Sequence, residues 1–215
     1  MSEIAIVIGN KNYSLWSLRV WLALKRCYIG FDETILLLDM LDTKEKLIHN
    51  SKSGLVPVLK CADITIWETM AICKYLAEIY PAAKLWPDEA KTRTYCRSVS
   101  NEMHAGFVPL RSHMSMDIKI TYPGEGRGPG VKYIIARIVD IWANCQKQFG
   151  QYGPFLFGEF TIAVAVFAPP VARFKTFAID VCEVATAYMS AVCECPGMQE
   201  WRATAEAETQ IIKYV

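Results

Sequence analysis

Short apolar runs and amphipathic stretches alternate along the first third of the chain, a pattern typical of strands and helices that follow one another. Residues 4–8 are β-branched and apolar, which predicts a buried strand. In chain order we expect a strand over 4–8, a helix over 17–26, a strand over 34–38, a helix over 43–50, strands over 56–59 and 64–67, and a helix over 68–79. This β-α-β-α-β-β-α order predicts an α/β domain in which a right-handed crossover joins the first two strands.

The predicted hairpin contains a proline in its first strand. Pro57 has no N–H to donate to a ladder, so it marks a sheet edge, a strand start or a cis bond. Each of these leaves main-chain groups beside Val56 free for a partner. Directly after the hairpin, Glu68 and Thr69 open the next predicted helix.

The pattern changes at residues 81–88, where two prolines bracket a segment that cannot be helical throughout. We place a linker there, with one domain over residues 1–80 and another over 89–215. Beyond the linker the apolar spacing is helical, and helices are expected over 89–117, 131–149, 161–174, 181–191 and 198–207. The second domain is therefore predicted to be all-helical.

Composition and charge narrow the class of protein. The 215 residues are 53% hydrophobic and 21% charged, which suits a well-packed globule. A net charge of +1 gives no electrostatic reason to expect nucleic acid or an anionic membrane as a partner. The first apolar run is too short for a signal peptide, and no run is long enough to span a membrane, so we expect a cytoplasmic protein.

The eight cysteines form no CxxC pair, and no cysteine has a neighbouring set of metal ligands. Most of them stand within apolar patterns, where a free cysteine acts as a small hydrophobic residue. We therefore expect core packing and no metal site.

Four motifs resemble the glutathione transferase family, in order and with fitting spacing over nearly the whole chain. Residues 12–19 look like the loop and first helical turn of serine-type, bacterial or zeta-like members, and Val56-Pro57 looks like the cis-proline step. Glu68-Thr69 looks like the Glu/Gln-Ser/Thr pair of the third helix, and residues 158–163 look like the start of the buried helix. The resemblance implies a cytosolic glutathione transferase with a thioredoxin-like first domain, a helical second domain and a homodimeric assembly. Its implied role is detoxification, by conjugating glutathione to small hydrophobic electrophiles.

Glutathione, the co-substrate that the family implies, is an extended tripeptide with two carboxylates, an ammonium group and a thiol. The main chain of Val56, exposed by Pro57, can pair with its cysteinyl unit as one rung of a strand. The helix that begins near Glu68 offers N–H groups to the γ-glutamyl carboxylate, Thr69 adds a hydroxyl, and Glu68 can accept the ammonium group. Plain helix capping by Glu68-Thr69 is the alternative explanation.

The glycyl carboxylate lacks its usual partner in this chain. Family members often carry Lys, Arg or Gln just before the Val-Pro step, and Leu55 stands there instead. Leu55 cannot donate a hydrogen bond, so Lys44, His49 or Lys52 is expected to substitute.

Conjugation requires a thiolate. A free thiol has a pKa near 8.5, and lowering it by about two units requires roughly 2.7 kcal/mol. Ser14, at the start of the first helix, is the expected hydroxyl donor to the sulfur. Tyr13, Ser17 and Asn12 remain alternatives, because a slip of one or two residues exchanges them, and an ordinary N-cap also explains a serine there.

The electrophile site is expected on the first helix of the second domain. Met103 and Phe107 would form an apolar wall, and His104 and Arg111 would orient an anionic electrophile. Core or dimer contact explains the two apolar residues equally well.

Two other functions remain open. One is a glutathione-dependent isomerase of the maleylacetoacetate type, in which Arg111 and His104 would hold a dicarboxylate. The other is a binding or assembly module without turnover. Leu55 favours this module, as does Val164, which stands where the buried helix usually carries the acidic residue of a capping box.

Overall fold

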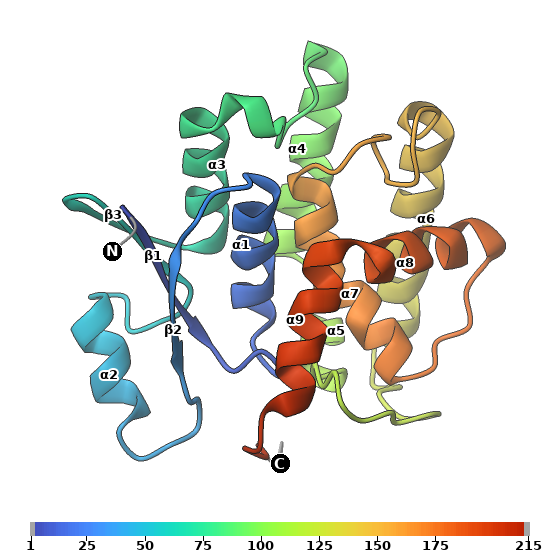
Figure 1. Ribbon diagram of the computed structural model, residues 1–215. Helices are drawn as coiled ribbons and strands as arrows, with labels where there is room; N and C mark the ends of the chain where they lie inside the picture. Colours follow the sequence, from blue (N-terminus) through green and yellow to red (C-terminus); the bar gives the residue numbers. More distant parts are fainter. Residues whose placement is uncertain (1–2, 213–215) are drawn as a thin grey trace.

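The computed structural model describes residues 3–212 and contains one mixed sheet beside a helical body (Figure 1). The sheet order is β2-β1-β3-β4, built from β1 (Ile4–Gly9), β2 (Asp32–Leu36), β3 (Val58–Cys61) and β4 (Ile64–Trp67). β2 runs parallel to β1, whereas β3 and β4 follow as an antiparallel hairpin. The helices of the first part are α1 (Leu15–Arg26), α2 (Thr43–Asn50) and α3 (Thr69–Ile79), which confirms the predicted β-α-β-α-β-β-α order.

The two faces of the sheet are covered by different helices. Alternate side chains of a strand point to opposite faces, so Ile6 and Ile8 of β1 join the main core with α1 and α3. Val7, between them, joins a smaller cluster with Leu36 and Val58, against which Leu47 of α2 packs. This single-residue alternation is the reason that α2 lies across the sheet from α1 in Figure 1.

The helical body consists of six helices within residues 84–212, and α7 lies at its centre. Nearly every residue of α7 is buried, and the helix contacts α1, α4 and α8. Its N-cap, Thr161, makes no side-chain capping bond. The helices are α4 (Ala90–Ala105), α5 (Val108–His113), α6 (Val131–Phe149), α7 (Ile162–Thr176), α8 (Glu183–Glu194) and α9 (Pro196–Ala207), and the short 3-10 helix η1 (Pro81–Ala83) precedes them.

The helix predicted over residues 89–117 was wrong as a single element. The chain leaves the helix at Gly106, Phe107 adopts a left-handed φ of 60°, and α5 begins a new direction. Pro109, in the first turn of α5, explains the break, because proline inside a continuous helix would clash with the carbonyl four residues earlier. Other predicted ends differ by one to three residues: α1 begins at Leu15 rather than 17, β2 covers 32–36 rather than 34–38, and β3 begins at Val58 rather than 56.

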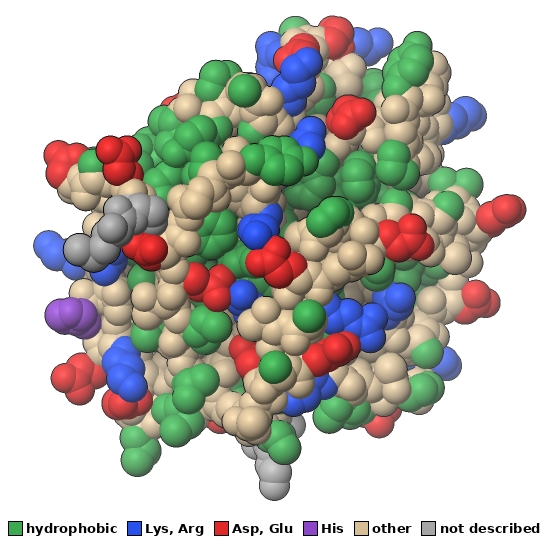
Figure 2. All heavy atoms as spheres, in the orientation of Figure 1, with side chains coloured by type: hydrophobic (Ala, Val, Ile, Leu, Met, Phe, Trp, Pro, Cys, Tyr) green, Lys and Arg blue, Asp and Glu red, His purple; other side chains and the backbone are tan. Residues whose placement is uncertain are grey.

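The fold class is thus confirmed as a thioredoxin-like sheet domain followed by a helical domain, while the exact linker at 81–88 stays a prediction. No helix within residues 3–212 is long and apolar enough to cross a membrane. On the face drawn in Figure 2, Lys and Arg side chains are interspersed with Asp and Glu. In the same described range, no group of three or more potential ligands is placed to hold a metal ion.

Seven of the eight cysteines are buried or half-buried, and all eight are free. Burial raises the pKa of the Cys73, Cys96 and Cys145 thiols to about 12, so they stay protonated. This placement agrees with the predicted packing role, with the exposed Cys182 as the exception.

Candidate active site

A cavity of about 490 Å³ lies where the hairpin passes into α3, facing the start of α1 and the end of α4. Its lining includes five of the residues predicted from the sequence, which are Val56, Pro57, Glu68, Thr69 and His104. Trp16, Ser53, Leu55 and Trp67 complete it.

The wall beside β3 is formed by Val56 and Pro57, and the bond between them is cis, as the family resemblance predicted. β3 starts only at Val58, so Val56 lies outside the ladder. Within residues 3–212 no hydrogen bond engages the main chain of Val56. Its N–H and C=O are therefore available to an extended ligand.

Glu68 caps α3 and shapes the opposite wall. Its carboxylate accepts hydrogen bonds from the N–H groups of Met70 and Ala71, at 3.0 and 2.9 Å. The capping explanation of Glu68 is therefore correct, and it does not exclude a ligand. The Thr69 N–H and hydroxyl have no partner in the described chain, so the first donors of the helix stay available at the cavity.

His104 joins the two domains at this cavity. Its Nε2 lies 2.9 Å from Oε1 of Glu68, and its ring meets Trp16 edge-on at 5.2 Å. Burial lowers the pKa of the His104 imidazole; the Glu68 carboxylate opposes this, and three nearby cations lower the pKa further. The neutral imidazole, donating from Nε2 to Glu68, is thus the form at neutral pH, and its buried Nδ1 has no partner among residues 3–212.

We expect His104 to make the folded protein lose stability on acidification. The pKa of His104 is lower in the folded state than in the unfolded state. The stabilisation that the neutral imidazole gives the folded protein is therefore complete above about pH 6.5 and is lost as the pH falls below that value. Urea unfolding at pH 7.5 and 5.5 should show a smaller loss for His104→Gln than for the wild type. The control is His49→Gln, which changes an exposed histidine of α2. Equal losses in all three proteins would contradict this prediction.

Trp16, which the sequence analysis missed, separates the cavity from two arginines. The guanidinium carbons of Arg19 and Arg111 lie 4.5 and 5.0 Å from its ring centroid. Arg111 donates to the carbonyls of Met103, His104 and Gly106, so it caps the end of α4 instead of lining the cavity. The available signal was a tryptophan in the first turn of the first helix, three residues before an arginine.

The remaining predicted binding residues lie away from the cavity. Met103 and Phe107 are buried in the core, which is the alternative that their spacing left open. Lys44, His49 and Lys52 are exposed on α2 or just after it and do not line the cavity. Of the expected electrophile site, only His104 reaches the cavity surface.

Ser14 is the N-cap of α1 and is buried. Its hydroxyl donates to Oγ of Ser17 at 2.7 Å, and Ser17 accepts a second bond from the N–H of Gly9 at 3.1 Å. Neither serine lines the cavity. The Ser14 hydroxyl does not cap its own helix, so the N–H groups of Trp16 and Ser17 have no partner in the described chain.

The polar groups of Asn12 and Tyr13 face other parts of the chain. The Asn12 amide donates to Asp117 at 3.0 Å, and its oxygen accepts from the main chain at residues 118 and 119. The Tyr13 hydroxyl accepts from the N–H of Ile212 at 3.2 Å. Both side chains thus fasten the loop to distant segments.

Residues 208–210 contact the loop that precedes α1 through hydrogen bonds to residues 10–12, a contact that the sequence did not predict. The Glu208 carboxylate accepts from the N–H groups of Lys11 at 2.6 Å and Asn12 at 3.1 Å. The Gln210 side chain accepts from Asn10 and donates to the carbonyl of Leu38, at 2.7 and 2.6 Å. The loop that carries Ser14 is therefore held by hydrogen bonds from residues 208–210.

Replacing Glu208 with alanine should lower the free energy of unfolding by about 1–3 kcal/mol, because two main-chain N–H groups lose their acceptor. Hydrogen exchange at Lys11 and Asn12 should accelerate. The matched control is Glu206→Ala, which removes only an exposed ion pair with Arg202. Unchanged stability and protection in Glu208→Ala would show that the segment does not hold the loop.

Comparison with known proteins agrees with this geometry. Residues 13–79 match the family model described as glutathione S-transferase, N-terminal domain. The curated maleylacetoacetate isomerase of Rattus norvegicus is 27% identical over 171 residues, which are 77% of this chain and 75% of the rat protein.

Solved structures share the fold over almost the whole chain. A maleyl pyruvate isomerase, described as a bacterial zeta-class glutathione S-transferase, has a TM-score of 0.73 at 16% identity and covers 96% of this chain and 100% of its own. A glutathione transferase homologue from Burkholderia, solved with bound glutathione, has a TM-score of 0.70 at 20% identity, covering 95% of this chain and 98% of its own. Residues 13–79 of this chain thus match the glutathione S-transferase N-terminal domain, and the chain as a whole shares the two-domain fold of these solved structures.

Proposed function

We propose that this protein is a glutathione transferase that adds the glutathione thiolate to small hydrophobic electrophiles. One observation carries the proposal: Val56 and Thr69 line the same cavity, and within residues 3–212 neither the Val56 main chain nor the Thr69 donors have a hydrogen-bond partner. An extended peptide can form one strand rung with Val56 while its γ-glutamyl carboxylate accepts from Thr69. Glu68, half-exposed beside them, supplies the countercharge for the ammonium group.

Ser14 is our proposed hydroxyl donor to the glutathione sulfur, as in a serine-type enzyme. The Ser14 hydroxyl now donates to Ser17, and a neutral hydrogen bond of this kind contributes only about 0.5–1.5 kcal/mol. Rotating the Ser14 hydroxyl from Ser17 toward a thiolate therefore costs little free energy. The uncapped N–H groups of Trp16 and Ser17 add the positive end of the α1 dipole. Among the other candidates, Asn12 and Tyr13 bond to distant segments, and Ser17 accepts the buried N–H of Gly9, whereas the Ser14 hydroxyl bonds to the neighbouring Ser17.

Leu55 remains the least favourable feature for glutathione binding. It is 68% exposed at the cavity rim and offers no donor for the glycyl carboxylate. Lys52 is the nearest of the proposed substitutes along the chain. Weak binding of glutathione is therefore expected.

A glutathione-dependent isomerase is the second candidate. The rat relative is named maleylacetoacetate isomerase, and His104 lines the cavity beside Trp16, whereas Arg111 lies behind the Trp16 ring and donates to the α4 carbonyls. We further propose a homodimeric, cytoplasmic protein with a role in detoxification.

Retention on immobilised glutathione, followed by conjugation of a generic aryl halide, tests the proposal. Retention with turnover supports the transferase. Retention without turnover, together with isomerisation of a cis dicarboxylate, would favour the isomerase. Failure to bind glutathione at all would favour a binding or assembly module.

A further inference from the structure

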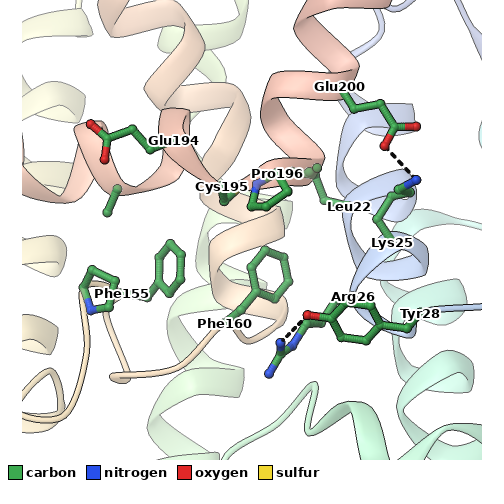
Figure 3. Close-up of a pocket in the computed structure, with 13 residues that line it drawn as sticks. Leu22, Lys25, Arg26, Tyr28, Phe155, Phe160, Glu194, Cys195, Pro196 and Glu200 are labelled. Carbon is green, nitrogen blue, oxygen red and sulfur yellow. Dashed lines mark hydrogen bonds and ion pairs between the residues drawn. The ribbon is translucent and has the colours of Figure 1, made fainter.

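The segment that follows α9, residues 208–212, lies at the start of α1. α9 packs against α1, and Lys25 in the last turn of α1 pairs with Glu200 of α9 at 2.7 Å, as Figure 3 shows. The indole of Trp201 donates to the carbonyl of Lys11, which precedes α1, at 2.8 Å. α9 therefore runs antiparallel to α1, and the segment after it reaches the loop before α1 (Figure 1).

The loop of residues 10–14 is buried along its whole length. Ser14, at its end, donates from its N–H to the carbonyl of Asn10 at 2.8 Å. The Asn10 side chain accepts from the N–H of Leu38 and donates to Gln210, both at 2.7 Å. Two hydrogen bonds that meet at Asn10 therefore connect Gln210 to the main chain of Ser14.

Glu208 holds the middle of the same loop. Its carboxylate accepts from the N–H groups of Lys11 and Asn12, and within residues 3–212 these groups have no other acceptor. A buried N–H without an acceptor costs about 1–3 kcal/mol, so the loop would have to move if Glu208 were lost. The position of the loop thus depends on residues 208 and 210.

Residues 208–212 do not line the active-site cavity, so they can act on the reaction only through the parts of the chain that they hold. They hold the loop that ends at Ser14, the proposed donor to the glutathione sulfur. A displacement of about 1 Å at a reacting group can cost roughly a hundredfold in rate. The fixed place of the loop therefore matters for catalysis as well as for stability.

We propose that Glu208 and Gln210 are positioning residues for the thiol chemistry, a role that rests on the proposed glutathione function. They fix the loop of residues 10–14 and, through it, the Ser14 hydroxyl that donates to the thiolate. Neither of them touches glutathione, so their loss leaves the binding cavity intact and misplaces only the donor.

The charge and the hydrogen bonds of Glu208 act on the thiolate in opposite directions. A carboxylate close to a thiol disfavours the thiolate, so removing the charge alone would lower the pKa of bound glutathione. Releasing the loop raises that pKa, because the donor no longer stays at the sulfur. The other charged groups around the loop, which the test leaves unchanged, are Lys11 paired with Glu33 at 2.8 Å, Asp117 and Lys119.

The ultraviolet absorbance of the bound thiolate gives the pKa of glutathione on each protein. Glu208→Ala and Gln210→Ala should each raise this pKa by at least about half a unit, which is about a threefold change in the ionisation constant. S-methylglutathione, which has no thiol proton, should bind to both variants within about twofold of the wild type. The control is Glu206→Ala, which removes only the exposed ion pair with Arg202 and should keep the wild-type pKa.

The double variant Ser14→Ala/Gln210→Ala should have the same glutathione pKa as Ser14→Ala, because Gln210 acts through Ser14. Gln210→Ala keeps both bonds of Glu208, so it serves as the test if Glu208→Ala does not fold. An unchanged or lower pKa in the folded variants, additive effects in the double variant, or weaker S-methylglutathione binding would overturn the positioning role. Failure of the wild type to bind S-methylglutathione would instead refute the proposed function, and this role with it.

Discussion

Ser14→Ala is expected to lower kcat/KM for aryl halide conjugation at least tenfold near pH 7, an effect of about 1.4 kcal/mol or more. In the proposed mechanism the Ser14 hydroxyl stabilises the thiolate, so its loss should raise the pKa of bound glutathione. The deficit should therefore shrink near pH 9, where the thiolate forms without help. A pH profile of kcat/KM measures both effects.

Ser17→Ala is the matched control. Ser17 accepts the buried N–H of Gly9, so its loss should lower stability by about 1–3 kcal/mol without the same change in the pH profile. If Ser14→Ala retains the wild-type rate and profile, the donor role passes to Ser17 or to the N–H groups of α1.

Arg19→Met is expected to stabilise the protein by about 1–4 kcal/mol. Arg19 is fully buried, and its three guanidinium nitrogens have no hydrogen-bond partner within residues 3–212. Burial, together with the charges of Arg111 and Arg173, holds the pKa of Arg19 well below its ordinary value. Methionine keeps much of the apolar stem against Trp16 and removes the desolvated charge. Urea unfolding and the melting temperature measure the change.

Arg19→Lys serves as the control, because it keeps a buried charge and gives up the stacked guanidinium on Trp16. It should be less stable than the wild type. A melting temperature that falls in Arg19→Met would mean that the cation–π contact with Trp16 outweighs desolvation.

The local parts of the candidate site could be predicted from the sequence. Pro57 cannot donate to a ladder, and Glu68-Thr69 can begin a helix. These local properties were sufficient to predict the residues that form both walls of the cavity. The break after α4 was also readable in principle, since Pro109 stands inside the predicted helix.

The remaining parts depend on tertiary contacts that leave no local pattern. Glu208 accepts a hydrogen bond from the N–H of Lys11, 197 residues earlier in the chain, and the local sequence at neither position predicts this bond. Helical spacing predicts that the side chains of His104 and Arg111 lie on one face only if a single straight helix carries both residues. Because the chain turns at Phe107, Arg111 folds back onto the α4 carbonyls instead.

The most direct test of the central claim is a calorimetric titration of the wild type and Thr69→Val with glutathione. The variant keeps the shape of the side chain, and only the hydroxyl at the start of α3 is lost. We predict one site per chain in the wild type and affinity at least about tenfold lower in Thr69→Val, because a charge-assisted hydrogen bond is worth about 1.5–3 kcal/mol. No binding by the folded wild type, or equal affinity in the two proteins, would contradict the assignment of this cavity to glutathione.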